Sequence, residues 1–276
     1  MHFGVDLGRC NPRLWLDLAR AGDELGYDSV WLPEHLIFPE TIVGSPAPDD
    51  AHITVDPRTP LFDPFAMLAA IAAVTERIRV GINVYNIGLR HPFTTARGAA
   101  TVDIVSNGRC ILGVGASWLR AEWEAVGLDF ETRGARVDES IEICRRLWTE
   151  PTVQHAGVHY EFGPVVFEPK PVQAHLPIHV GGDSDRALRR VAELGDGWIA
   201  MVQDEASFAT AVEKLRTLCD RNGRDCDAIE RTAMVRDPDD GAVESWRSAG
   251  ATRLIVAPWS RSTEAVDGLA AFRPNR

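Results

Sequence analysis

The chain has little that would mark a secreted, membrane or nucleic-acid-binding protein. No run approaches eighteen consecutive apolar residues, and Met1–Asp6 lacks the basic and then apolar order of a signal peptide. We therefore expect a cytoplasmic protein without a membrane span. The formal net charge of −11 disfavours nucleic acids and anionic membranes as partners, because like charges repel at long range. These absences leave a small-molecule substrate as the expected partner.

Cysteine and lysine are also scarce. The five cysteines form no C-x-x-C pair and show no histidine spacing that suits zinc, so we expect reduced thiols and no metal site. Lys170 and Lys214, the two lysines, both lie away from predicted strand ends, which disfavours a lyase or isomerase that needs a carboxylate–lysine pair. Paired-carboxylate, S-x-x-K and H-E-x-x-H patterns of hydrolases are missing as well.

Short β-type runs alternate with amphipathic helical segments eight times along the 276 residues. This alternation predicts a parallel sheet closed into one (β/α)₈ TIM barrel, an α/β fold, and no domain boundary divides residues 1–276. The predicted strands are His2–Leu7, Ser29–Leu32, Arg79–Val84, Arg109–Val114, Ile178–Gly181, Gly197–Met201, Arg231–Val235 and Arg253–Ala257. The predicted helices are Arg13–Leu25, Pro64–Thr75, Pro92–Ser106, Arg133–Trp148, Asp185–Leu194, Glu205–Asn222 and Val243–Ala249.

Residue types at the segment ends support these boundaries. Pro64 and Pro92 suit first-turn positions, and Ser184 suits an N-cap. Gly26, Gly195 and Gly250 each follow a predicted helix, where a left-handed residue is often needed; we predict that conformation at all three.

Two segments are additional to the strands and helices of a (β/α)₈ barrel. Pro33–Asp63 is long, polar and proline-rich, and loops of that length in compact domains are usually lids or binding loops. It follows the second strand. Thr152–Tyr160 indicates a β-hairpin that turns at Ala156-Gly157, inserted before the fifth strand.

Two glycine-rich turns carry the strongest chemical signal. Gly113–Trp118 follows the fourth strand and Gly181–Ser184 follows the fifth, and each opens into a helical pattern. Such turns expose backbone N–H groups at a positive helix end and can hold phosphate. One such turn is a weak signal, because most only reverse the chain. The pair predicts that one phosphorylated ligand lies at the carboxyl ends of the strands.

Polar residues follow the second and third strands. His35 is a candidate proton donor, since a free imidazole titrates near neutrality, or else it anchors the long loop. Glu34 can pair with His35 or with an arginine. Asn83 interrupts an apolar strand end, which favours a backbone irregularity or a ligand contact. Arg90 is a candidate anion ligand, with pairing to a surface carboxylate as the alternative.

Other candidates lie near the later strand ends. Trp118 and Trp259 are candidate walls for a flat ring, whereas core packing is favoured for Trp31. Arg186 opens the helix after the fifth strand and is a second candidate anion ligand. Glu122 is expected to cap a short helix. A group of helical charges is predicted to form a solvated face without chemistry. These are Arg133, Arg136, Asp138 and Glu139.

Taken together, the chain resembles the luciferase-like monooxygenase superfamily, in its branch of predicted coenzyme F420-dependent oxidoreductases. The resemblance covers residues 1–200 well and the last quarter only in strand–helix rhythm. The segments that carry it are YDSVWLPEH (27–35), LRHP (89–92), ATVDIVSNGR (100–109), LGVG (112–115), PIHVGG (177–182) and GDGW (195–198).

The resemblance implies a site at the carboxyl ends of the strands that binds FMN or F420. It implies a non-proline cis peptide at Asn83-Val84, whose bulge supports the ring. It places Glu34 and His35 near the reactive face, with Glu34 orienting His35. The implied phosphate contacts are Gly115, Ala116, Ser117, Gly181, Gly182 and Asp183, with help from Arg90 or Arg186.

The implied activity is hydride transfer between C5 of F420 and a small organic substrate. An FMN-dependent monooxygenase, using O₂ and reduced flavin from a partner reductase, is one alternative; a non-catalytic flavin- or F420-binding barrel is another. Trp118 stands where some F420-dependent sugar-phosphate dehydrogenases carry an acid, which disfavours that substrate class. By analogy with the family we expect a homodimer.

Overall fold

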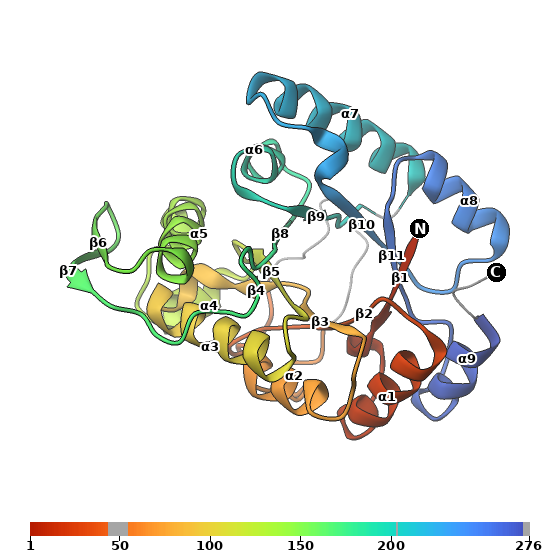
Figure 1. The fold of residues 1–276 in the computed structure, drawn as a ribbon. Coiled ribbons are helices and arrows are strands. Elements are labelled where there is room, and N and C mark those ends of the chain that lie inside the picture. Colours follow the sequence, from red (N-terminus) through yellow and green to blue (C-terminus); the bar gives the residue numbers. More distant parts are fainter. Residues whose placement is uncertain (44–54, 203, 273–276) are drawn as a thin grey trace.

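A computed structural model describes residues 1–43, 55–202 and 204–272. Within these residues, eight parallel strands form a closed barrel (Figure 1), which confirms the predicted fold. The third and fourth barrel strands pair at Val80–Cys110 and Gly81–Ile111, and the first and last pair from His2–Arg253 to Val5–Val256. In barrel order the strands are β1 (His2–Asp6), β2 (Ser29–Leu32), β3 (Arg79–Ile82), β5 (Cys110–Gly115), β8 (Ile178–Gly181), β9 (Gly197–Ile199), β10 (Glu230–Val235) and β11 (Arg253–Val256).

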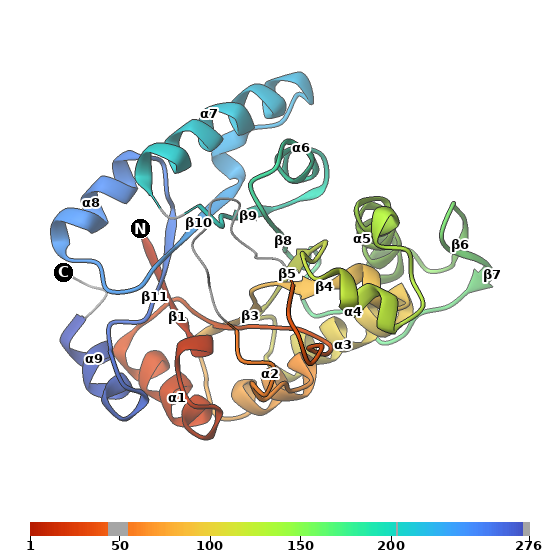
Figure 2. The same ribbon diagram turned by 180° about the vertical axis from the view of Figure 1, so that it is seen from behind.

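Helices surround the barrel on its outer face (Figures 1 and 2). Their apolar residues pack against the strands, which are buried on both faces and accordingly read as short apolar runs. None of the described helices is both long and apolar enough to cross a bilayer. The helices are α1 (Trp15–Leu25), α2 (Pro64–Ala72), α3 (Pro92–Val105), α4 (Arg120–Ala125), α5 (Arg133–Thr149), α6 (Asp185–Leu194), α7 (Glu205–Arg221), α8 (Asp240–Ser248) and α9 (Ala265–Phe272).

Most predicted helix ends are confirmed. Pro64 and Pro92 begin α2 and α3, and the Ser184 side chain accepts a hydrogen bond from the N–H of Ala187. Gly26 and Gly250 adopt left-handed φ angles of 83° and 99°. The prediction for Gly195 is wrong: its φ is −89°, because the chain passes directly from α6 into an extended segment.

Two helical predictions need correction near the carboxyl terminus. The sequence pattern predicted no helix after the eighth strand, yet α9 lies there and buries Leu269 in the core beside α1. Helix α8 begins at Asp240 rather than Val243, because the Asp239 side chain caps it by accepting from the N–H of Ala242.

The structure describes one of the two predicted insertions in full and the other in part. Strands β6 (Val153–Ala156) and β7 (Glu161–Val165) form the expected antiparallel hairpin, which projects beside α5 (Figures 1 and 2). The long loop after β2 is described only in part, because residues 44–54 lie outside the described residues. Its described flanks line a cavity at the top of the barrel.

The barrel interior is filled by one large aromatic residue and smaller aliphatic ones. Trp31 is 1% exposed and packs with Ile111, Ile199 and Ile255, so its predicted role in the core is confirmed. A Cβ atom at Gly81 would lie 2.7 Å from the Trp31 ring, so only glycine leaves room for the indole there.

The third strand does not continue to Val84 as predicted. It ends at Ile82, the Asn83-Val84 peptide bond is cis, and pairing with β5 resumes in the two-residue strand β4 (Tyr85–Asn86). The implied cis peptide is therefore present. This break turns the Val84 side chain toward the ends of β5 and β8.

Candidate active site

A cavity of about 1460 Å³ opens at the carboxyl ends of the barrel strands. Barrel enzymes carry their catalytic groups at this end. Most of the predicted site residues contribute to its lining, whereas Arg90 and Trp259 do not. The predicted residues that line it are Glu34, His35, Asn83, Val84, Gly115, Ala116, Ser117, Trp118, Gly181, Gly182, Asp183 and Arg186.

His35 is held by Glu122 and not by its neighbour Glu34. Nδ1 of His35 lies 3.3 Å from Oε2 of Glu122, a side chain of α4 that is completely buried. Glu122 makes no capping hydrogen bond at the start of α4, so the prediction of a capping role is wrong. The His35 ring also contacts Phe38 at 4.7 Å and the edge of Trp118 at 5.7 Å between centroids.

The Glu122 carboxylate is the centre of a buried hydrogen-bond network. It accepts from the N–H of Leu36, from Ser117 Oγ at 3.1 Å and from Asn86 Nδ2 at 3.3 Å. Burial acts to raise the pKa of Glu122, but the contacts with His35, Leu36 and Ser117 hold it below the usual value. Glu122 is therefore anionic, so Nδ1 of His35 donates to it. The second ring nitrogen, Nε2, makes no hydrogen bond to any described residue.

Glu34 forms an ion pair with Arg90 instead. Oε1 of Glu34 lies 2.6 Å from Arg90 Nη2, and its Oε2 accepts from the N–H of Asn86 at 2.8 Å. The guanidinium also stacks over Tyr85 at 4.5 Å. Arg90 is not among the residues that line the cavity, which disfavours the predicted phosphate contact. It pairs with a carboxylate, as the alternative held, but with the buried Glu34 and not with a surface group. Asn86 bonds to both buried carboxylates and so connects the two pairs.

The glycines at the ends of β5 and β8 make room for Val84. A Cβ atom would lie 2.6 Å from Val84 Cγ2 at Gly115 and 2.8 Å from Val84 Cγ1 at Gly181. Val84 therefore forms a ridge in the cavity lining, and it fits there because Gly115 and Gly181 carry no Cβ atom. The sequence pattern had pointed to phosphate as the reason for these glycines, and that reading remains a prediction.

Two members of the second glycine turn already have hydrogen-bond partners. The N–H of Gly182 donates to the carbonyl of Ile199 at 3.1 Å, so it is unavailable to phosphate. The Asp183 carboxylate accepts from the N–H of Met201 at 3.0 Å and ties down the segment after β9. Burial raises the pKa of Asp183. Both residues shape the cavity wall through contacts that the sequence pattern did not indicate.

Basic residues gather on the α5–α6 side of the cavity. Arg186 and Arg189 are exposed on α6 and form no ion pair with any described residue. Arg133 also lines the cavity, with its guanidinium 3.9 Å from the Phe130 ring centroid, whereas Arg190 is buried against Asp138. Arg189 was missed in the sequence; its i, i+3 spacing from Arg186 was the available signal.

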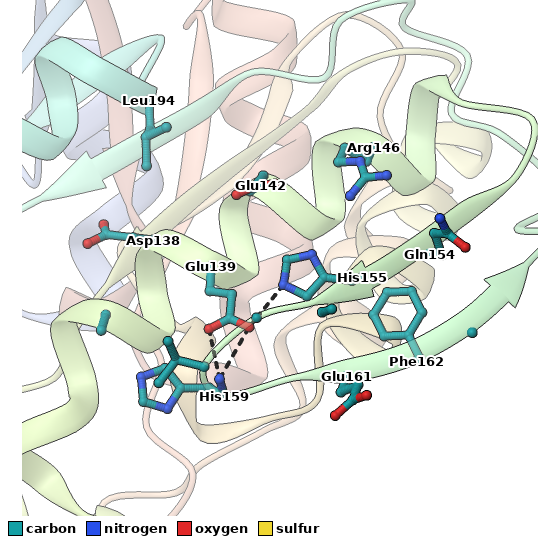
Figure 3. A pocket seen from close by; sticks show the side chains of 15 residues that line it. Asp138, Glu139, Glu142, Arg146, Gln154, His155, His159, Glu161, Phe162 and Leu194 are labelled. Atoms are coloured by element: carbon teal, nitrogen blue, oxygen red, sulfur yellow. Dashed lines mark hydrogen bonds and ion pairs between the residues drawn. The ribbon is translucent and has the colours of Figure 1, made fainter.

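A second hollow, of about 1040 Å³, lies between α5 and the β6–β7 hairpin (Figure 3). Glu139 accepts there from His155 Nε2 at 3.0 Å and from the backbone N–H groups of His159 and Tyr160. The prediction that Glu139 lies on a solvated helix face is wrong, because this carboxylate fastens the hairpin to α5. Asp138 also differs from the predicted solvated face, because it forms an ion pair with the buried Arg190.

Trp259 is not a wall of the cavity. It is buried in the main core, and its Nε1 donates to the carbonyl of Arg9 at 3.1 Å. Trp118 does line the cavity beside His35, and its role as a ring wall remains a prediction.

A closed parallel barrel with an acid–histidine pair at its strand ends defines a (β/α)₈-barrel enzyme. The chain belongs to the luciferase-like monooxygenase family, whose model matches residues 3–253. It is 29% identical over 264 residues to the F420-dependent glucose-6-phosphate dehydrogenase of Segniliparus rotundus, across 92% of this chain and 72% of the relative.

Two solved structures share the fold. Monooxygenase RslO1 from Streptomyces bottropensis superposes with a TM-score of 0.79 at 22% identity, over 99% of this chain and 98% of its own. The coenzyme F420-dependent tetrahydromethanopterin reductase of Methanopyrus kandleri gives 0.79 at 17% identity, over 97% and 96%. The family match makes the chain an enzyme of the luciferase-like type, and the two solved structures show that it shares their fold.

Proposed function

We propose that this protein is an F420-dependent oxidoreductase that transfers a hydride between the deazaflavin and a small organic substrate. The observation that carries the proposal is the His35–Glu122 pair: an anionic carboxylate fixes one nitrogen of a cavity histidine, and the other is left for proton transfer. The 29% identical F420-dependent relative supports the choice of cofactor.

The residues present fit a flat ring with an anionic tail. The Val84 ridge, set between Gly115 and Gly181, offers an apolar support for a ring. Arg186, Arg189 and the first N–H groups of α6 are the groups that would hold the tail, because its phosphate and carboxylates need cations and backbone donors. They would do so in a protein whose overall charge is negative.

F420, when bound, supplies a hydride acceptor or donor at C5 of its ring. In the oxidative direction Nε2 of His35 would accept the proton of the substrate hydroxyl, and the electron pair of that O–H bond would form the C=O bond as the hydride leaves the substrate carbon for F420. Glu122 stabilises the resulting imidazolium and keeps the ring in one orientation. Trp118 and Phe38 contact the imidazole ring of His35 and so limit the access of water to it.

Titration of the purified protein with F420 and with FMN, followed by tryptophan fluorescence, tests the cofactor. We expect saturable F420 binding in the micromolar range and much weaker FMN binding. A protein that binds FMN and not F420 would overturn the proposal and favour the FMN-dependent monooxygenase. His35→Asn should keep its F420 affinity and lose turnover by about 10²–10⁴-fold. Full turnover in that variant would contradict the assigned role of His35.

A further inference from the structure

We propose that the substrate is an uncharged, mostly hydrocarbon alcohol or carbonyl compound, bound in the half of the cavity over β1 and β2. This inference rests on the proposed function, which places the cofactor tail on the α5–α6 side. We call this half the apolar lobe. Its lining residues are Cys10, Trp15, Phe38, Leu61, Phe62 and Met67.

Aromatic and aliphatic groups form the surface of the apolar lobe. Trp15 and Phe62 meet edge to face at 5.5 Å between ring centroids. The indole Nε1 of Trp15 donates to the carbonyls of Leu7 and Cys10, so its polar atom is satisfied within the protein. Phe62 remains 45% exposed and Leu61 36% exposed. Exposed apolar groups that line a cavity indicate a surface covered by a ligand.

The apolar lobe offers no unpaired cation among the described residues. Arg9, which lines the cavity beside the apolar lobe, lies 3.8 Å from Asp6, and Glu34 is paired with Arg90. Burial raises the pKa of the Cys10 thiol, which is therefore neutral. The chain's two lysines, Lys170 and Lys214, are not part of the cavity lining. A phosphate or carboxylate would lose hydration here without gaining a cation.

His35 fixes which end of the substrate is polar. Its ring contacts Phe38 of the apolar lobe and also Trp118, which follows β5. A hydroxyl or carbonyl oxygen at His35 leaves the hydrocarbon part of the substrate against Trp15 and Phe62. Each buried methylene should then strengthen binding by about fourfold.

The test uses F420-loaded protein and secondary alkanols of increasing chain length, with glucose 6-phosphate as the charged comparison. We expect KM to fall by about fourfold per methylene until the apolar lobe is full, and glucose 6-phosphate to be a poor substrate. Phe62→Ala should raise KM for the longest alkanols by about tenfold while leaving F420 affinity unchanged. Val158→Ala, at an exposed residue of the hairpin, is the matched control and should change neither.

A second readout separates the failure of this inference from failure of the proposed function. Binding of the matching methyl ketones to cofactor-free protein is followed by tryptophan fluorescence. A chain-length dependence here without F420 binding would keep the apolar lobe and reject the proposed cofactor. F420 binding combined with a flat chain-length dependence, or with preferred use of glucose 6-phosphate, would overturn the inference and leave the cofactor assignment standing.

Discussion

Nδ1 of His35 and Oε2 of Glu122 lie 3.3 Å apart across 87 positions of the chain. Glu122 is fully buried and receives further hydrogen bonds from Leu36, Ser117 and Asn86. The carboxylate therefore acts as a fixed hydrogen-bond acceptor for Nδ1. The other ring nitrogen, Nε2, is left for a ligand in the cavity. The loop after β2, strand β4 and the loop after β5 meet at this one side chain.

Glu122→Gln should lower kcat by at least about tenfold, part of the 10²–10⁴-fold that general acid–base groups contribute. A glutamine has one acceptor oxygen and brings an NH₂ group against donors that now point at a carboxylate. The free energy of unfolding should also fall by about 1–3 kcal/mol. Glu124→Gln, on the exposed face of the same helix, is the control for both measurements.

The pH profile distinguishes orientation from general damage. If Glu122 stabilises protonated His35, the variant should show a lower apparent pKa for turnover as well as a lower rate. A variant with reduced rate but an unmoved profile would assign Glu122 a structural role alone.

Gly115→Ala should destabilise the protein by about 1–3 kcal/mol, because the new Cβ would lie 2.6 Å from Val84 Cγ2. Val84→Ala removes that atom, so the double variant should be more stable than the sum of the single changes predicts. Urea unfolding measures all three. Gly163→Ala is the control, since nothing lies within 4 Å of a Cβ there. Additive effects would show that Val84 and Gly115 do not share this space.

The barrel could be predicted from the sequence because its signals are local. Strand and helix periods, Pro64 at a helix start and Gly26 at a helix end each act within a few residues. The site depends on contacts between distant loops, which no local pattern specifies. Glu34 was the obvious partner for His35, but in the loop after β2 these two neighbouring side chains pair with different residues. Glu34 reaches Arg90.

The glycine turns were located correctly in the sequence, but only phosphate binding was considered as the reason for their glycines. A glycine can be required for backbone donors or for the close approach of another group, and the sequence does not distinguish these. Here the packing of Val84 gives a second reason for glycine at positions 115 and 181, beside the phosphate contact that remains a prediction. Contacts across the barrel supply that information.

Breaking the Glu34–Arg90 pair should destabilise the protein strongly. Glu34→Gln and Arg90→Met should each cost about 3–5 kcal/mol, because each leaves a buried group without its partner. The double variant should cost clearly less than their sum. The exposed pair of Asp17 and Arg20, with Nη1 2.8 Å from Oδ1, serves as the comparison and should contribute less than about 1 kcal/mol. Equal effects at the two pairs would mean that burial of Glu34 adds nothing.

Arg186→Gln and Arg189→Gln should weaken F420 binding, by about tenfold for the pair, with little change in stability. Both side chains are exposed and form no ion pair with the described residues, so their removal breaks no internal contact. The salt dependence of F420 affinity should become shallower, since screened charge attraction is the term removed. Arg221→Gln, exposed at the end of α7, is the charge-matched control. Unchanged affinity in the double variant would place the anionic tail elsewhere.

Buried ionisable residues near the amino ends of the barrel strands should make the free energy of unfolding depend on pH. His179 is 1% exposed there, and burial lowers its pKa to about 3. Its Nε2 lies 3.6 Å from Glu230, which pairs with Arg253 and Arg79. Burial acts to raise the pKa of Glu230, but Arg253, His179 and Arg79 together lower it to about 2. Protonation therefore favours the unfolded chain at both residues.

The sign follows from which state binds the proton. An unfolded histidine titrates near pH 6.5, so the contribution of His179 is fully present above about pH 6.5 and is lost as the pH falls toward 3. Glu230 adds a second loss between about pH 4.5 and 2. Urea unfolding between pH 7.5 and 4.5 should show stability falling by up to about 1.4 kcal/mol per pH unit for each proton. His179→Gln removes the upper step, so its profile should be flatter above pH 5. Parallel profiles for the two proteins would mean that His179 is protonated in the folded barrel.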